Sequence, residues 1–456
     1  MADNGASGDG AGSGTDSGAA PGLLNGLQVL DFSQFAFGPV ATRLLADLGA
    51  DVIKVEPLEG DFSRLTAEPF VDSITFICTN LNKRSFSVNL KDERGLDAVK
   101  RLCEQADVLV ENFRPGTMDR MGLGYEELSK INPGLVYGSF SMFGESGPLS
   151  HRRGGDMWAQ AFAGFVTSQT DPDGDQSPWV NGHNVIDYGG GAVNAYALMA
   201  ALWNRERTGR GQKVTNNLVN TAVLMQWPAI AHYLSEGIEF RKEGRGGVRS
   251  RFPYAAYPAS DGYVLTIFGQ DDTEWRIVCE ILEIEHVLDD PRYDTVEKRN
   301  AARLELYPVL DEAFSKRTRV EWQEAFRARQ LRCDPCLDYE EFTTHGQFIE
   351  NSMAVTVDDP RDGELVMPAS PVRFSNYPPP ETANHSPILG EHTEAVLAEL
   401  GYGEAEIETL SEEGAVGVPL PDMFTAQRQL VGKDARQRGV FKSTKLEREQ
   451  QQGTSS

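Results

Sequence analysis

Residues 27–56 read LQVLDFSQFAFGPVATRLLADLGADVIKVE, and this stretch decides the fold class. Residues 27–32 form a short apolar run that is typical of a buried strand, and residues 52–56 form a second one. Between these runs, Gly38 and Pro39 open a helical spacing of leucines. A strand, a helix and a strand within roughly 30 residues predict a βαβ unit, with which a doubly wound sheet begins.

After residue 56 the sequence continues to alternate between helical spacing and apolar runs of strand length. Residues 95–105 and 125–131 have helical spacing, whereas residues 107–111 and 134–140 are apolar runs of strand length. This alternation predicts the α/β class with a mainly parallel sheet. Residues 254–268 have a different pattern, because two short strands flank a turn, and helices follow them. We therefore expect a second, smaller α+β domain.

Composition marks the two ends of the chain as separate segments. The first residues are rich in Gly, Ser, Ala and Asp, and the last are charged and rich in Gln, so neither end offers much apolar surface to bury. We predict a flexible tail at 1–21, the first part of a large domain at 22–225, a small domain at 226–319, a return to the large domain at 320–420 and a weakly ordered tail at 421–456.

The charge balance excludes some classes of partner. The 456 residues include 43 Lys and Arg against 68 Asp and Glu, which gives a net charge of −25. This balance disfavours nucleic acid and anionic membranes, because both bind basic surfaces. The sequence contains no apolar run of about 18 residues and no secretory signal pattern. We therefore expect a soluble cytoplasmic protein that binds neither nucleic acid nor membrane.

The five cysteines are too few for a disulfide framework in a chain of this length. Cys333 and Cys336 have the spacing of a CxxC pair, but no second such pair completes a zinc site. We expect no bound metal.

Residues 181–191 read NGHNVIDYGGG and place Asp187 just before three glycines and an apolar helical pattern. Glycines let the backbone approach a ligand closely, and a helix start offers free N–H groups and a positive dipole end. Asp187 is thus a candidate catalytic carboxylate. From these residues alone, the commoner interpretation is that Asp187 caps the helix and that the glycines bend the chain.

Basic residues gather in the middle of the α/β region, several of them just past predicted strand ends, where α/β sheets bind ligands. They are Lys83, Arg84, Lys91, Arg114, Arg120, Arg152 and Arg153. Phosphate groups are natural partners of such residues, although ordinary solvated surface charges give the same pattern. No G-x-G-x-x-G follows the first strand, and residues 138–144, GSFSMFG, are not a G-x-S-x-G elbow. A dinucleotide-binding oxidoreductase and a serine hydrolase are therefore both weak hypotheses.

The chain contains a series of short motifs in a specific order. They are LDF at 30–32, GP at 38–39, LGADVIKVE at 48–56, NKRS at 82–85, ENFRPG at 111–116, RMG at 120–122, SMFG at 141–144, TGRGQKV at 208–214, PY at 253–254 and LGEH at 389–392. With this set the chain resembles the family III CoA-transferases, from about residue 24 to residue 402. That family includes the formyl-CoA:oxalate and carnitine CoA-transferases and is related to the α-methylacyl-CoA racemases.

The resemblance implies a Rossmann-like large domain built from both ends of the chain, with a small domain between them. It also implies that two copies interlock as a homodimer. The expected substrates are an acyl-CoA and a carboxylic acid, with coenzyme A bound as a thioester substrate and no cofactor held permanently.

The resemblance also assigns site residues. Asp187 corresponds to the catalytic nucleophile, and we expect its ordinary pKa near 4 to keep it ionised. Gly189, Gly190 and Gly191 are the expected oxyanion donors through their backbone N–H groups. The expected CoA-binding residues are Ala36, Phe37, Val88, Lys91, Asn112, Phe113, Arg120, Met121, Arg152, Arg153, Gly154 and Gly155.

Two alternatives stay open within this resemblance. A racemase needs an acid and a base on opposite faces of the α-carbon. The histidine that supplies one of them in the racemases falls on Gly155, and His151 lies four residues earlier, which disfavours racemisation. Asp156 remains as an auxiliary acid, although a helix cap is the commoner role for such a residue. A non-catalytic subunit of a heteromeric transferase is disfavoured by the presence of Asp187.

Overall fold

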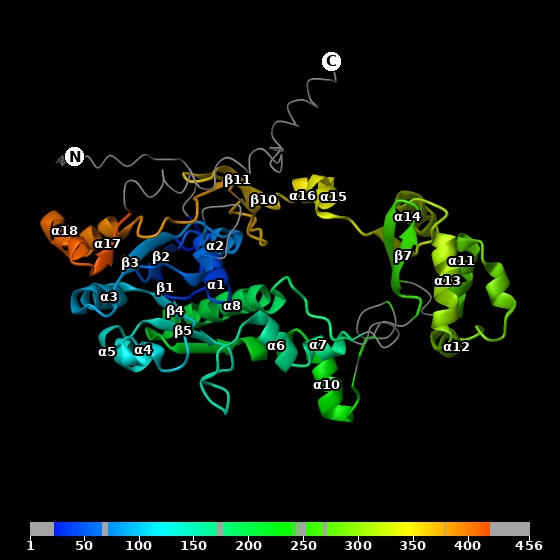
Figure 1. Cartoon of the computed structure of the whole chain (residues 1–456), viewed down its shortest axis with the longest axis horizontal. Helices are drawn as coiled ribbons and strands as arrows, with labels where there is room; N and C mark the ends of the chain where they lie inside the picture. The colour runs from blue at the N-terminus through cyan, green and yellow to red at the C-terminus, as the bar shows by residue number, and fades with distance from the viewer. Residues whose placement is uncertain are drawn as a thin grey trace, which may run out of the picture.

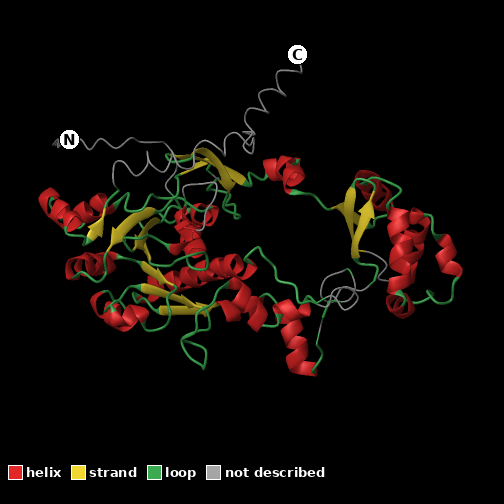
Figure 2. Cartoon of the chain, in the orientation of Figure 1, coloured by secondary structure: helices red, strands yellow, loops and turns green. Residues whose placement is uncertain are grey.

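The computed structural model describes residues 22–65, 72–170, 177–239, 241–242, 245, 252–267, 271–378 and 380–419. The two tails predicted at 1–21 and 421–456 lie outside the described residues. Strands and helices alternate through the first half of the chain (Figures 1 and 2), as the sequence predicts for the α/β class.

One large sheet organises the chain. Its strands are β1 (Gln28–Asp31), β2 (Asp51–Glu56), β3 (Arg84–Val88), β4 (Val108–Glu111), β5 (Val136–Ser141), β6 (Lys213–Asn217) and β13 (Val416–Gly417). They lie in the order β13-β3-β2-β1-β4-β5-β6. The pairs among β1 to β6 are parallel, and β13 adds to β3 in the antiparallel sense. The order 3-2-1-4-5-6 is that of a Rossmann-type sheet, so the predicted fold class is confirmed.

Helices cover both faces of this sheet, because its central strands are apolar on both sides. Alternate residues of β1 show this: Leu30 belongs to one buried cluster and Val29 to the other. The first cluster includes side chains of α3 (Glu93–Gln105), α5 (Tyr125–Ile131), α17 (Thr393–Glu399) and α18 (Glu404–Glu412). The second includes side chains of α1 (Pro39–Ala46), α6 (Asp156–Phe162), α8 (Val185–Thr208) and α9 (Leu218–Leu224).

Further helices complete this part of the chain. They are η1 (Phe62–Leu65), α2 (Ile74–Asn80), α4 (Thr117–Arg120), α7 (Phe165–Ser168) and α10 (Trp227–Glu236).

A second unit has its own antiparallel sheet and its own core. Its elements are β7 (Ala255–Ala259), β8 (Gly262–Ile267), α11 (Asp272–Leu282), η2 (Glu285–Asp289), α12 (Val296–Ala301), α13 (Arg303–Phe314), α14 (Arg319–Ala328) and β9 (Arg332–Pro335). The expected boundary at residue 319 is wrong. Trp322 and Phe326 of α14 are buried in this core, and β9 pairs with β8. The unit therefore extends through Pro335, and the return to the large domain begins after it.

The returning chain adds α15 (Tyr339–Thr344), α16 (Gly346–Glu350), β10 (Ala354–Asp359), β11 (Gly363–Pro368) and β12 (Thr382–Ala383). Figure 1 shows α15 and α16 between the two units. Strands β10 and β11 pack against α2 through Ile77 and Val357, which are both buried. The Arg361 guanidinium bonds both Asp72 and the Ser386 carbonyl, so buried ion pairs also join the two ends of the chain. Within the described residues no helix is long and apolar enough to cross a membrane.

Candidate active site

The carboxyl ends of the parallel strands meet at one edge of the large sheet, where doubly wound folds bind ligands. The loop after β1 carries Ala36 and Phe37, and the loop after β4 carries Asn112 and Phe113. Helix α8 leads into β6, which is parallel to β5, so α8 begins at the same edge. Topology alone therefore places Asp187 on the same side as the expected CoA-binding loops.

Helix α8 begins earlier than its apolar pattern indicates, and an aspartate from another helix caps it. Asn184, in the left-handed conformation with φ 49°, precedes the first helical residue and gives no side-chain cap. The cap comes from Asp156 of α6, whose Oδ2 accepts hydrogen bonds from the N–H groups of Ile186 at 2.7 Å and Asp187 at 2.9 Å. The predicted cap role of Asp156 thus holds, but for α8. Asp187 is the capped residue and not the cap.

The Asp187 carboxyl group lies in an unusual environment. Its side chain is only 2% exposed, and Oδ2 has no hydrogen-bond partner. Burial raises the pKa of Asp187 to about 7, and the nearby Asp156 charge contributes in the same direction. The expectation of an ordinary pKa near 4 is therefore wrong, because water is excluded and no cation among the described residues compensates the charge. Perturbed carboxyl groups of this kind cluster at functional sites.

The three glycines after Asp187 have a packing role that the sequence does not reveal. They lie inside α8, where the helix's own carbonyls accept their N–H groups. A Cβ atom on Gly190 would lie 2.2 Å from the Phe37 ring, and one on Gly191 would lie 2.5 Å from Val40. Gly189 is equally close to Met225, at 2.1 Å. Because the helix already uses their N–H groups, the expected oxyanion role of these glycines does not fit this structure. Gly190 and Gly191 allow α8 to approach α1 and its preceding loop, and Gly189 allows it to approach Met225.

The loop between β1 and α1 is fixed directly to α8. Phe37 is buried, and its carbonyl accepts a hydrogen bond from Asn194 Nδ2 at 3.1 Å. Its ring meets Phe140 edge to face, with centroids 6.2 Å apart. Ala36 is fully buried. Either residue can therefore reach CoA only through its backbone or after rearrangement of neighbouring side chains.

Asn112 fixes the other side of the same loop. Its Oδ1 accepts from the Gln34 N–H at 2.8 Å, and its Nδ2 donates to the Gln34 carbonyl at 2.7 Å. The next residue, Phe35, has a φ of 67°, a left-handed conformation that is costly for a bulky side chain. Such strain persists only where surrounding contacts hold it, and the Asn112 clamp is one of them.

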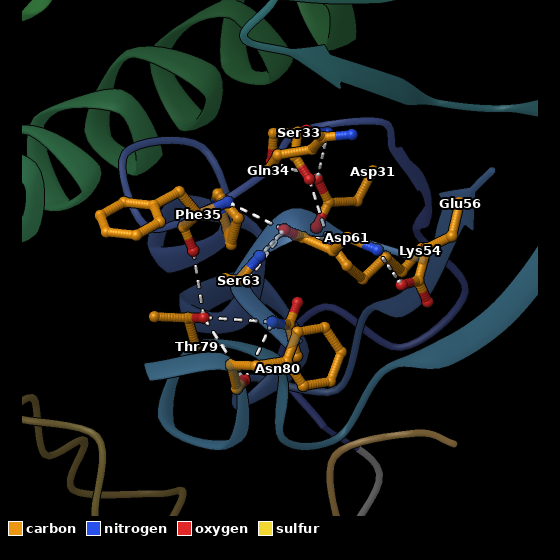
Figure 3. A network of polar contacts seen from close by, with 12 residues as sticks. Asp31, Ser33, Gln34, Phe35, Lys54, Glu56, Asp61, Ser63, Thr79 and Asn80 are labelled. Atoms are coloured by element: carbon orange, nitrogen blue, oxygen red, sulfur yellow. Dashed lines mark hydrogen bonds and ion pairs between the residues drawn. The ribbon is translucent and has the colours of Figure 1, made fainter. Parts of the chain in front are cut away.

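A buried ion network lies beside this loop (Figure 3). Asp31, the last residue of β1, accepts from Lys83 Nζ at 2.8 Å, and Lys54 Nζ lies 2.9 Å from Asp61. Burial raises the pKa of Asp31, but the charges of Lys83 and Lys54 outweigh it and hold the value at about 2. Lys54 also donates to the Ser33 carbonyl. The Phe35 ring points away from this network, so the network anchors the backbone of the loop and leaves the ring outside.

The remaining expected CoA-binding residues fall into two groups. The Val88 side chain is buried in the core, and Val88 pairs with Val416 of β13, so its expected contact with CoA stays a prediction that only its backbone could serve. Phe113 and Met121 are partly buried against the same core. Exposed residues of the set are Lys91, Arg120, Arg152, Arg153 and Gly154.

Gly155 bears on the choice between CoA transfer and racemisation, which the sequence leaves open. It precedes α6, and a Cβ atom placed there would meet no atom closer than 4.0 Å. Space for a side chain therefore exists where the racemases place a histidine, but this chain has none. His151 and His183 are both exposed.

The sequence does not single out two residues that the structure places in the candidate site. Gln160 is fully buried, and its side chain joins Asp156 to the backbone of Asn181. Asn194 joins α8 to the Phe37 carbonyl. The only available signal for Gln160 is its position four residues after Asp156, one turn along the same helix face.

Comparisons with known proteins agree with this geometry. A model of CoA-transferase family III matches residues 24–393. Succinyl-CoA:glutarate CoA-transferase of Mus musculus is 36% identical over 397 residues, which cover 86% of this chain and 90% of the relative. Formyl-CoA:oxalate CoA-transferase of Streptomyces coelicolor is 35% identical, with coverage of 86% and 99%. A solved CAIB/BAIF family protein from Brucella suis matches with a TM-score of 0.75 and 31% identity, covering 84% of this chain and 100% of that one.

The Rossmann-type sheet and these similarities define an enzyme of the transferase class. The chain belongs to CoA-transferase family III, and the resemblance inferred from its motifs is confirmed.

Proposed function

We propose that this enzyme moves CoA from an acyl-CoA donor to a carboxylic acid acceptor through a covalent intermediate on Asp187. The observation that carries the proposal is the buried Asp187 carboxyl group, whose Oδ2 has no partner at the ligand-binding edge of the sheet. Leaving a buried polar atom unpaired costs stability, which a protein tolerates where function requires it.

In the first half-reaction, an oxygen of the Asp187 carboxylate attacks the thioester carbonyl of the donor. The carbon–sulfur bond breaks, CoA leaves as a thiolate, and a mixed anhydride remains on Asp187. The thiolate then attacks the Asp187 carbonyl carbon. The donor's carboxylate leaves, and an aspartyl-CoA thioester remains on the enzyme.

The second half-reaction reverses these steps with the acceptor acid. Its carboxylate attacks the Asp187 carbonyl carbon and expels CoA thiolate, which forms a second anhydride. The thiolate attacks the acceptor's acyl carbon, and Asp187 leaves as a free carboxylate. The raised pKa of Asp187, about 7, favours its attack on the donor thioester, because a more basic carboxylate is a stronger nucleophile.

For CoA itself we propose the loops at the carboxyl edge of the sheet. The exposed cations Lys91, Arg120 and Arg152 suit the phosphate groups of CoA, whereas the backbone near Phe37 and Asn112 suits the pantetheine arm. Because relatives are named for oxalate and glutarate, short dicarboxylic acids are the first acceptors to test.

A transfer assay in deuterated water tests the proposal against racemisation. We expect the purified enzyme to form a new acyl-CoA from succinyl-CoA and a dicarboxylic acid. We expect no deuterium at the α-carbon of a 2-methylacyl-CoA, since Gly155 supplies no second acid or base. Deuterium incorporation without an acceptor acid, and no transfer to any acid, would instead identify a racemase.

We also propose that a second copy of the chain covers an aromatic face of α8. Tyr196 and Trp203 are 73% and 69% exposed and lie on one side of this helix, together with Met199. Large exposed apolar side chains that gather on one face mark association surfaces. We expect light scattering to give twice the 50.2 kDa chain mass for the wild type. We expect Trp203→Lys to lower that mass towards one chain, and an unchanged dimer would exclude this face.

A further inference from the structure

Asp156 holds the start of α8 from a neighbouring helix. One oxygen of its side chain, Oδ2, receives the N–H groups of both Ile186 and Asp187. These are two of the N–H groups that a helix start cannot satisfy internally. Asp156 is itself 4% exposed, so a buried negative charge lies at the positive end of α8.

Gln160, one turn further along α6, holds the other oxygen of Asp156. Its Nε2 donates to Asp156 Oδ1 and to the Asn181 carbonyl at 2.9 Å, while its Oε1 accepts from the Asn181 N–H at 3.1 Å. The segment that carries Asp187 is therefore clamped to α6 at both ends. The Asp187 side chain receives none of these hydrogen bonds, and its Oδ2 stays unpaired.

Among the residues that the structure describes, no cationic side chain offsets the negative charges of Asp156 and Asp187. Arg43 is the charged residue of α1, and its guanidinium bonds the carbonyls of Cys78 and Pro368 and approaches Asp47. Helix α9 contains no titratable side chain. On α8 itself, Tyr188 adjoins Asp187, whereas Arg205, Glu206 and Arg207 lie at the far end.

The two flanking strands also supply no compensating charge. Tyr137 of β5 belongs to the core on the opposite face of the sheet. Lys213 of β6 pairs with Glu145. Asp156 is thus the charge that Asp187 meets at close range.

We propose that Asp156 is a positioning residue that makes Asp187 a strong nucleophile by occupying the helix start in its place. The Asp156 carboxylate takes the N–H groups and the favourable end of the dipole, so Asp187 is neither a cap nor half of an ion pair. This inference rests on the proposed function of Asp187.

The Asp156 charge also affects the stability of the covalent intermediate relative to free Asp187. Asp156 repels the ionised carboxylate of free Asp187. The acylated Asp187 side chain is neutral, so Asp156 does not repel it. Burial and the Asp156 charge together raise the pKa of Asp187 to about 7. Loss of the repulsion on acylation therefore favours formation of the intermediate relative to the free carboxylate.

Asp156→Asn tests the inference, because the amide oxygen can still accept both N–H groups while the charge is lost. We expect the pKa of Asp187 to fall below that of the wild type, so that the acid limb of kcat/KM for CoA transfer moves to lower pH. Above pH 8, we expect the rate to drop roughly threefold to tenfold, since a less basic carboxylate attacks more slowly. An unchanged acid limb would overturn the inference.

A readout that needs no activity separates this inference from the proposed function. The Asp187 carboxyl carbon can be titrated by NMR in full-length protein labelled with [4-¹³C]aspartate, and its signal is assigned by its loss in Asp187→Asn. A lowered titration midpoint in Asp156→Asn supports the coupling, and an unchanged one contradicts it. A shifted midpoint in a protein that transfers no CoA would contradict the proposed function and leave the coupling intact.

Two further variants serve as controls. Asp156→Ser supplies a neutral cap acceptor of another shape and should shift the midpoint in the same direction, so a folding fault in one variant leaves the other informative. Gln160→Met removes the clamp but changes no charge. It should lower kcat and leave the acid limb in place, whereas an equal shift in this variant would assign the effect to structure alone.

Discussion

Replacement of Asp187 by asparagine is expected to lower the rate of CoA transfer by roughly 10⁴-fold or more, as loss of a covalent nucleophile does in other enzymes. The amide has nearly the same shape and fills the same buried position, but it has no carboxylate to form the anhydride. CoA should still bind with similar affinity, because the Asp187 side chain is buried and the exposed cations proposed to bind CoA are unchanged.

The measurements are an initial-rate transfer assay and calorimetric titration with CoA. Asp97→Asn is a matched control, since it makes the same chemical change at an exposed carboxylate on α3. It should leave both quantities unchanged. Transfer by Asp187→Asn at a rate near that of the wild type would exclude the covalent mechanism.

The same substitution is expected to stabilise the folded protein at neutral and alkaline pH. A pKa raised from 3.8 to about 7 means that ionised Asp187 is disfavoured in the fold. The ceiling on this effect is about 4 kcal/mol, at about 1.4 kcal/mol for each pKa unit. The amide also lacks full hydrogen bonding in this site, so we expect a gain of about 2 kcal/mol in the free energy of unfolding.

The sign of the pH dependence follows from proton binding. Between pH 4 and pH 7 the folded state retains the Asp187 proton and the unfolded state releases it, so the contribution of this group to stability falls as pH rises. The loss of stability caused by ionisation of Asp187 is complete above pH 7 and absent below pH 4. Asp187→Asn should therefore melt several degrees above the wild type at pH 8 and close to it at pH 4.5. Equal differences at both pH values would mean that ionisation of Asp187 is not the cause.

Sequence periodicity predicts the elements that lie in the middle of the fold. The βαβ unit from β1 to β2, the strand at β4 and the helix at α5 all stand where apolar spacing indicates them. Strand β3 is missed because Arg84 and two serines interrupt its apolar pattern, although its place between β2 and β13 buries it. Strand β9 is missed because it is held by pairing with β8, a contact that local sequence does not encode.

The sequence predicts less of the candidate site than of the fold. Asp187 can be singled out because a carboxylate precedes three glycines among ordered family motifs. Its raised pKa depends on burial and on Asp156, which lies thirty-one residues away in sequence. The glycines suggest an exposed backbone, but their spacing cannot reveal that Phe37 and Val40 lie against them. Contacts between distant segments decide each of these points.

The central claim is that Asp187 carries CoA during turnover, and mass spectrometry of the intact enzyme and its peptides tests it most directly. After incubation with succinyl-CoA and no acceptor acid, followed by rapid acid quenching, we expect a CoA adduct on the peptide that contains Asp187. Addition of an acceptor acid before quenching should remove the adduct, and Asp187→Asn should never form it. A transfer-competent enzyme that shows no adduct on this peptide, or that carries it on another residue, would contradict the claim.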